Sequence, residues 1–190
     1  MAQCKAASMP IDANDKLPSD GPAITDATSY GSSAGALQYL TITRPDLTFA
    51  VQQACLYMHD PRQQHLAQLK WILQYVRGRT SHGLLLRASP TLDVTAYSDA
   101  YWASCPETRR STLGFCVFLG DALVSWSSKR QPTVSRSSVE AEYRTVANAA
   151  VECIWLRQLL SELHFPILKA TVAFLRQCVG HLHVQESGPS

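Results

Sequence analysis

Residues 113–140 read LGFCVFLGDALVSWSSKRQPTVSRSSVE, and this stretch decides the fold. Apolar, aromatic and β-branched residues fill Leu113–Leu119 and Ala122–Ser127, and Gly120-Asp121 between them is typical of a tight turn. The pattern therefore predicts a β-hairpin. Ser137 followed three positions later by Glu140 is a capping box, which predicts that a helix begins here. A hairpin that leads into a long helix indicates an α+β fold with the helix packed on a sheet.

The helix that Ser137 opens is expected to run to about Leu163, because Phe165-Pro166 then interrupts the helical pattern. Apolar residues recur along it at helical spacing, which predicts one buried face. That expected face consists of Val139, Tyr143, Val146, Ala147, Ala150 and Ile154. We expect it to be the side of the helix that contacts the sheet.

Four shorter segments on either side of the hairpin also have strand-like composition. Leu84–Leu86 and Val94–Tyr97 precede the hairpin, and Thr133-Val134 and Thr171–Phe174 follow it. Each is short and apolar, which favours a strand over a helix. The second half of the chain is therefore expected to be a sheet with one long helix.

The first half has a different pattern. Residues 30–78 carry apolar side chains at helical spacing, with short helices expected around 36–40 and from Pro45 to Met58. A third helix fits Gln63–Arg77, with Gly78 suited to the position just after its end. Residues 1–29 are rich in Ala, Asp, Pro, Ser and Gly without periodicity, so we predict a flexible linker there.

Composition excludes several classes of protein. The 190 residues are 46% hydrophobic and 17% charged, which is typical of a globular chain and not of a disordered or fibrous one. The longest apolar run, Phe115–Leu119, is far shorter than a membrane span. No apolar region follows Lys5, and the six cysteines lack zinc-ligand spacing. We therefore expect an intracellular protein with reduced thiols, no membrane association and no structural zinc.

Two carboxylates are candidates for chemistry. Asp99 follows the apolar strand that begins at Val94, and Glu142 lies in the first turns of the long helix. Facing carboxylates on a strand end and a helix are the hard oxygen ligands that Mg²⁺ prefers. The alternative is structural: an Asp at a strand end commonly forms a turn, and a Glu early in a helix favours the helix dipole. Spacing alone leaves both interpretations open.

Basic residues cluster in the same part of the sequence. The net charge is −3 over residues 1–60, with three basic and six acidic side chains, and +5 over residues 61–190, with fourteen and nine. Five basic residues are candidates for nucleic-acid binding: Arg109, Arg110, Lys129, Arg130 and Arg136. With Trp102 and Trp126 between them, they suit a phosphate backbone with stacked bases, and the alternative is an ordinary basic surface. No glycine-rich phosphate loop follows a strand, so no nucleotide cofactor is expected.

Longer strings of the sequence resemble the C-terminal part of copia-type retrotransposon Pol polyproteins. The strings are GALQYL at 35–40, TRPD at 43–46, YSDA at 97–100, RRSTLGF at 109–115, SWSSKRQ at 125–131 and SRSSVEAEY at 135–143. The similarity extends from about residue 20 to residue 174. Because strings of this length are specific, the sequence is identified as a fragment of such a polyprotein.

The resemblance implies a function for each part of the chain. Residues 30–78 would be the thumb or connection region of the reverse transcriptase, and residues 79–174 a truncated ribonuclease H-like mixed sheet with its long packed helix. A ribonuclease H domain cleaves the RNA strand of an RNA–DNA hybrid with two metal ions, normally Mg²⁺. Asp99 and Glu142 match the family's first-strand aspartate and helix glutamate. An RNA–DNA hybrid is therefore the expected partner.

The sequence also departs from the family pattern. The polymerase aspartates are absent, and a Cys-Asp-Asn-x-Ser-Ala step expected after Phe174 is missing. One allowed codon choice for residues 175–185 encodes Cys-Asp-Asn-Val-Ser-Ala once a single base is removed. We therefore predict that residues 175–190 are an out-of-frame, unstructured tail and that the third metal-binding aspartate is lost with the frame.

Three functional hypotheses follow. The first is a degenerate Pol fragment with no useful nuclease activity, which the count of metal ligands favours. The second is a residual RNA–DNA hybrid endonuclease that recruits other ligands. The third is a non-catalytic remnant that binds nucleic acid or another protein.

Overall fold

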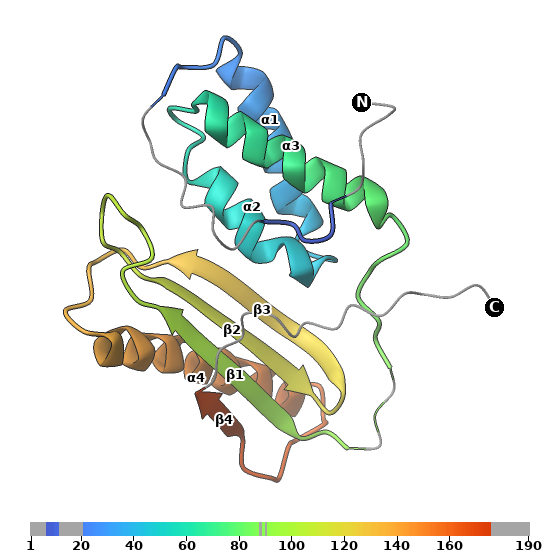
Figure 1. The fold of residues 1–190 in the computed structure, drawn as a ribbon. Helices are drawn as coiled ribbons and strands as arrows, with labels where there is room; N and C mark the ends of the chain where they lie inside the picture. Colours follow the sequence, from blue (N-terminus) through green and yellow to red (C-terminus); the bar gives the residue numbers. More distant parts are fainter. Residues whose placement is uncertain (1–6, 12–20, 88, 90, 176–190) are drawn as a thin grey trace. The chain divides into compact units, whose positions relative to one another are not determined.

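The computed structural model describes residues 7–11, 21–87, 89 and 91–175, which divide into two compact units (Figure 1). The described residues up to Leu84 form a helical unit, and those from Leu85 form a sheet unit. The division lies a few residues beyond the boundary expected after Gly78. The α+β class predicted from the sequence is confirmed, because helices and a mixed sheet occur together.

The described residues of the helical unit form three α-helices and one 3₁₀ turn. They are α1 (Ala27–Leu40), η1 (Pro45–Leu47), α2 (Thr48–Cys55) and α3 (Gln63–Gly78). Tyr30, Leu47, Leu69 and Ile72 are among the buried residues that pack together between them. Helix α1 begins earlier than the segment expected around 36–40. Its start is capped by Asp26, which accepts a hydrogen bond from the Ser29 amide at 2.8 Å.

The described parts of the predicted linker contact this helical unit. Ala7 is buried in its core, and the Trp71 indole N–H donates to the Met9 carbonyl at 2.9 Å. Ala23 forms an isolated antiparallel bridge with Arg62. Residues 7–11 and 21–29 thus contact the helical unit, although residues 21–29 are mostly exposed, whereas residues 1–6 and 12–20 lie outside the described part of the chain.

A buried ion pair holds η1 to the end of α3. The Arg44 guanidinium donates two hydrogen bonds to the Asp46 carboxylate, at 2.9 and 2.7 Å, and a third to the Arg79 carbonyl at 2.9 Å. The Tyr75 hydroxyl donates to Asp46 at 3.0 Å. The TRPD string therefore has a structural role, because Arg44 and Asp46 join two segments that are 35 residues apart in the sequence.

The sheet unit consists of four described strands and one helix. They are β1 (Val94–Tyr101), β2 (Thr112–Leu119), β3 (Ala122–Arg130), α4 (Ser138–Glu162) and β4 (Val172–Leu175). The strand order is β3-β2-β1-β4, with β1, β2 and β3 antiparallel and β4 parallel to β1. Helix α4 makes the crossover between β3 and β4 and lies along one face of the sheet (Figure 1).

The hairpin is formed as the sequence predicts. Gly120 has φ +56° between β2 and β3, a conformation that favours glycine. A Cβ atom there would also collide with the Ser89 side chain and the Thr91 carbonyl. The predictions of strands at Leu84–Leu86 and Thr133-Val134 are wrong, because both segments are irregular in the structure.

The buried face predicted for α4 is also wrong. Val139, Tyr143 and Ile154 are 55, 72 and 64% exposed. The residues that face the sheet are Ala141, Thr145, Ala149, Cys153 and Leu156, of which the last three pack with Val94, Ala96 and Val117. The small side chains allow a close approach of helix and sheet, and the Thr145 hydroxyl is satisfied by donating to the Ala141 carbonyl at 2.9 Å.

The last described strand is short and exposed along its length. Arg157 of α4 donates to the carbonyls of Ile167 and Lys169, both at 2.8 Å, which fixes the segment that leads into β4. The strand includes Leu175, the first residue of the predicted tail. Residues 176–190 lie outside the described part of the chain, so the prediction of an unstructured tail there stays a prediction.

Candidate nucleic-acid interface

The two candidate carboxylates lie on neighbouring elements of the sheet unit. Asp99 is half-buried near the end of β1, and Glu142 is exposed on the first turns of α4. In the antiparallel register, Asp99 is paired with Gly114 of β2. Because glycine has no side chain, Gly114 places no side chain opposite Asp99 in β2.

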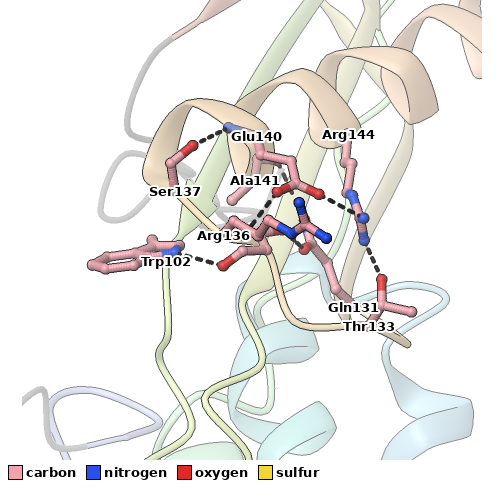
Figure 2. Close-up of polar contacts among 9 residues, drawn as sticks. Trp102, Gln131, Thr133, Arg136, Ser137, Glu140, Ala141 and Arg144 are labelled. Carbon is pink, nitrogen blue, oxygen red and sulfur yellow. Dashed lines mark hydrogen bonds and ion pairs between the residues drawn. The ribbon is translucent and has the colours of Figure 1, made fainter.

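A network of hydrogen bonds fixes the start of α4 (Figure 2). The Ser137 hydroxyl accepts from the Glu140 amide at 3.2 Å. The Glu140 carboxylate accepts from the Arg136 amide at 2.8 Å and from the Arg144 guanidinium at 2.7 Å. Arg144 also donates to the Thr133 hydroxyl. The Arg136 amide, with help from Arg144, holds the pKa of Glu140 below its ordinary value.

Gln131 links this helix start to the end of β3. Its side chain is 1% exposed, donates to the Ala141 carbonyl at 3.3 Å and accepts from the Ser135 hydroxyl at 2.6 Å. Its backbone amide donates to the Ser111 carbonyl at 2.8 Å. The hydrogen bonds of the buried Gln131 therefore connect the end of β3 to the first turn of α4 and to the residue that precedes β2.

The strand register brings four of the five candidate basic residues to the same end of the sheet. Lys129 and Arg130 end β3, where they pair with Leu113 and Thr112. Arg109 and Arg110 occupy the loop that leads directly into these β2 residues. The Arg109 amide donates to the Cys105 carbonyl at 2.9 Å, and the Cys105 amide donates to the Arg110 carbonyl at 3.2 Å, so the loop is internally bonded.

Arg136, the fifth candidate, precedes the helix cap Ser137 and is exposed. Arg109, Arg110 and Lys129 are exposed as well, whereas Arg130 is half-buried. Four positive side chains of this group thus face solvent and can reach an anionic ligand.

Two aromatic side chains lie at the end of β1. Tyr101 is 52% exposed and Trp102 is 42% exposed. The Trp102 indole N–H donates to the Ser135 carbonyl at 3.1 Å, which fixes the ring while leaving part of it open. Exposed aromatic rings next to positive charges suit stacking on nucleic-acid bases.

Sequence reasoning missed several residues at this end of the sheet unit. Tyr101, Gln131 and Arg144 were not among the candidates. Arg144 could have been found, since it follows Glu140 by four residues and such pairs meet on a helix. Nothing in the local pattern indicates that Gln131 is buried, because its role depends on the approach of α4 to β3.

The described residues contain no group of three or more His, Cys, Asp or Glu side chains that could hold a metal ion. Among the described helices, none is both long and apolar enough for a membrane span.

Comparison with known proteins identifies the family. The chain is 46% identical over 155 residues to an uncharacterised mitochondrial protein of Arabidopsis thaliana, covering 82% of this chain and 65% of that protein. It is 43% identical over 175 residues to the retrovirus-related Pol polyprotein from transposon RE1 of the same plant, covering 92% of this chain. With the corresponding polyprotein from transposon RE2 it shares 44% identity over 164 residues, or 86% of this chain.

These matches define a retrotransposon-derived protein. The chain belongs to the family of copia-type retrovirus-related Pol polyproteins. It spans 12% and 11% of the RE1 and RE2 polyproteins and 65% of the mitochondrial protein. No family model matches the sequence, and no solved structure matches it.

Proposed function

We propose that the sheet unit is the remnant of a ribonuclease H-type domain that binds RNA–DNA hybrids without cleaving them efficiently. The observation that carries this proposal is the grouping of Arg109, Arg110, Lys129 and Arg130 at one end of the sheet, close in the chain to Tyr101. Positive side chains that neutralise phosphates release counterions, which supplies affinity for any nucleic-acid backbone.

The position of Asp99 and Glu142 supports the ribonuclease H-type origin. The sheet unit has three antiparallel strands, a crossover helix and a fourth strand parallel to the first. Asp99 lies on the first strand and Glu142 on the helix, which are the positions that the resemblance implies. The family's reaction needs further carboxylates to offset the charge of two divalent ions. The third aspartate of the family motif is absent from the sequence after Phe174, so weak Mg²⁺ binding and little hydrolysis are expected.

Fluorescence anisotropy with a labelled RNA–DNA hybrid tests the binding. We expect binding that weakens with salt, and a Lys129→Gln variant whose salt slope is lower by about 1. Lys70→Gln is the matched control, because Lys70 is an exposed lysine of α3 in the other unit. Equal effects of the two substitutions would contradict a binding role for this end of the sheet.

The second candidate function is a residual hybrid endonuclease, and the presence of both Asp99 and Glu142 favours it. A cleavage assay in Mg²⁺ or Mn²⁺ separates the two. We expect no more than trace cleavage by the unmodified chain. Robust cleavage that Asp99→Asn abolishes would establish the endonuclease and overturn the proposal of a non-cleaving remnant.

A further inference from the structure

Helix α4 has a second apolar face, which points away from the sheet. We call it the outer stripe and define it as Tyr143, Ala147, Ala150, Val151, Ile154 and Trp155. At 100° per residue these positions lie opposite the line of residues that contacts the sheet. All six are exposed, and Trp155, the least exposed of the four large ones, is still 55% exposed.

The outer stripe is larger than isolated surface hydrophobics explain. The six residues of the stripe follow one another at intervals of three and four residues along about three turns of helix, with Ala147 between Tyr143 and Val151. Together they expose on the order of 500 Å² of apolar surface, which is the upper range for a monomeric protein. A face of this size marks an interaction surface, and two copies of it would together approach the area of a specific interface.

We propose that this face binds the same face of a second copy of the chain, with the two α4 helices antiparallel. Ala147 and Ala150 lie between the large residues of the stripe, so they leave room for Ile154 or Trp155 of the second copy. Small residues opposite large ones allow helices to interdigitate at close distance. A self-complementary stripe also meets the requirement of a two-fold interface, in which the same patch serves both subunits.

The helix dipoles favour the antiparallel orientation. When the two α4 helices run in opposite directions, the positive end of each lies beside the negative end of the other.

Sedimentation equilibrium of the full chain over a range of concentrations tests the proposal. We expect a reversible monomer–dimer equilibrium and a dissociation constant that rises at least about tenfold for Ile154→Glu, since each dimer carries the change twice. Leu168→Glu is the matched control, because Leu168 is 93% exposed and lies outside the stripe. Circular dichroism verifies that both variants keep the helix content of the unmodified chain.

A chain that stays monomeric at all concentrations, or a dimer that Ile154→Glu does not weaken, would overturn the proposal.

Discussion

Replacing Asp46 with alanine is expected to destabilise the helical unit strongly. The change removes the partner of the Arg44 guanidinium, whose side chain is 4% exposed. It deletes both Arg44–Asp46 hydrogen bonds and the one from Tyr75, and leaves Arg44 with the Arg79 carbonyl. A buried charge without its counterion typically costs about 3–5 kcal/mol.

Asp60→Ala is the control, because it breaks the same kind of Arg–Asp ion pair at an exposed position. Asp60 pairs with Arg62 two residues away, as Asp46 pairs with Arg44, but its side chain is 71% exposed. An exposed ion pair contributes about 0–1 kcal/mol, because water solvates both charges when the pair is broken. The difference between the two alanine variants therefore isolates the effect of burial.

Hydrogen exchange followed by mass spectrometry measures the effect in the helical unit alone. Amides of α3 around the buried residues Leu69 and Ile72 exchange through unfolding of that unit. We expect protection there to fall by about two to three orders of magnitude in Asp46→Ala, and by less than about tenfold in Asp60→Ala. Equal losses in the two variants would refute the argument that burial makes the Arg44–Asp46 pair important.

Three further outcomes are expected. Gly120→Ala should destabilise the sheet unit by about 1–2 kcal/mol in urea denaturation because of its positive φ and the collision of its Cβ, whereas Gly35→Ala in α1, where a Cβ meets nothing within 4 Å, should not. Gln131→Ala should cost about 1–3 kcal/mol and raise hydrogen exchange in the first turn of α4, and unchanged exchange there would contradict its linking role. Because the folded-state pKa of Glu140 is lowered, its contribution to stability should be full above about pH 4.5 and decline as pH falls through that lowered pKa; a Glu140→Gln variant with the same acid dependence as the unmodified chain would exclude this contribution.

Local signals in the sequence predicted several elements well. The turn at Gly120-Asp121 and the cap at Ser137 depend on residues close together in the chain, so the hairpin and the start of α4 could be placed without tertiary information. Helix α3 follows from its apolar spacing in the same way. The start of α1 was missed because Gly31 and Gly35 weaken the helical signal.

The packing of α4 could not be predicted from its own residues. The helix has two rows of apolar residues. The row with the larger side chains, which includes Tyr143 and Ile154, was predicted to be the buried one. The sheet instead contacts the small line that includes Ala141 and Ala149, because close approach requires small side chains. Burial of Arg44 and Gln131 likewise depends on partners distant in sequence. The roles of Asp99 and Glu142 in chemistry stay predictions.

The parallel pairing of β4 with β1 has a consequence for how the chain folds. β1, β2 and β3 are joined by short connections, but β4 reaches its place only after the whole of α4 has crossed the sheet. Such long-range pairing forms late, because the entropy of closing the long connection is lost before the contacts form. The pairing covers four residues, whose side chains are exposed. Within the sheet unit, β4 is therefore expected to dock last and to detach first, while the three-stranded meander and its helix remain folded.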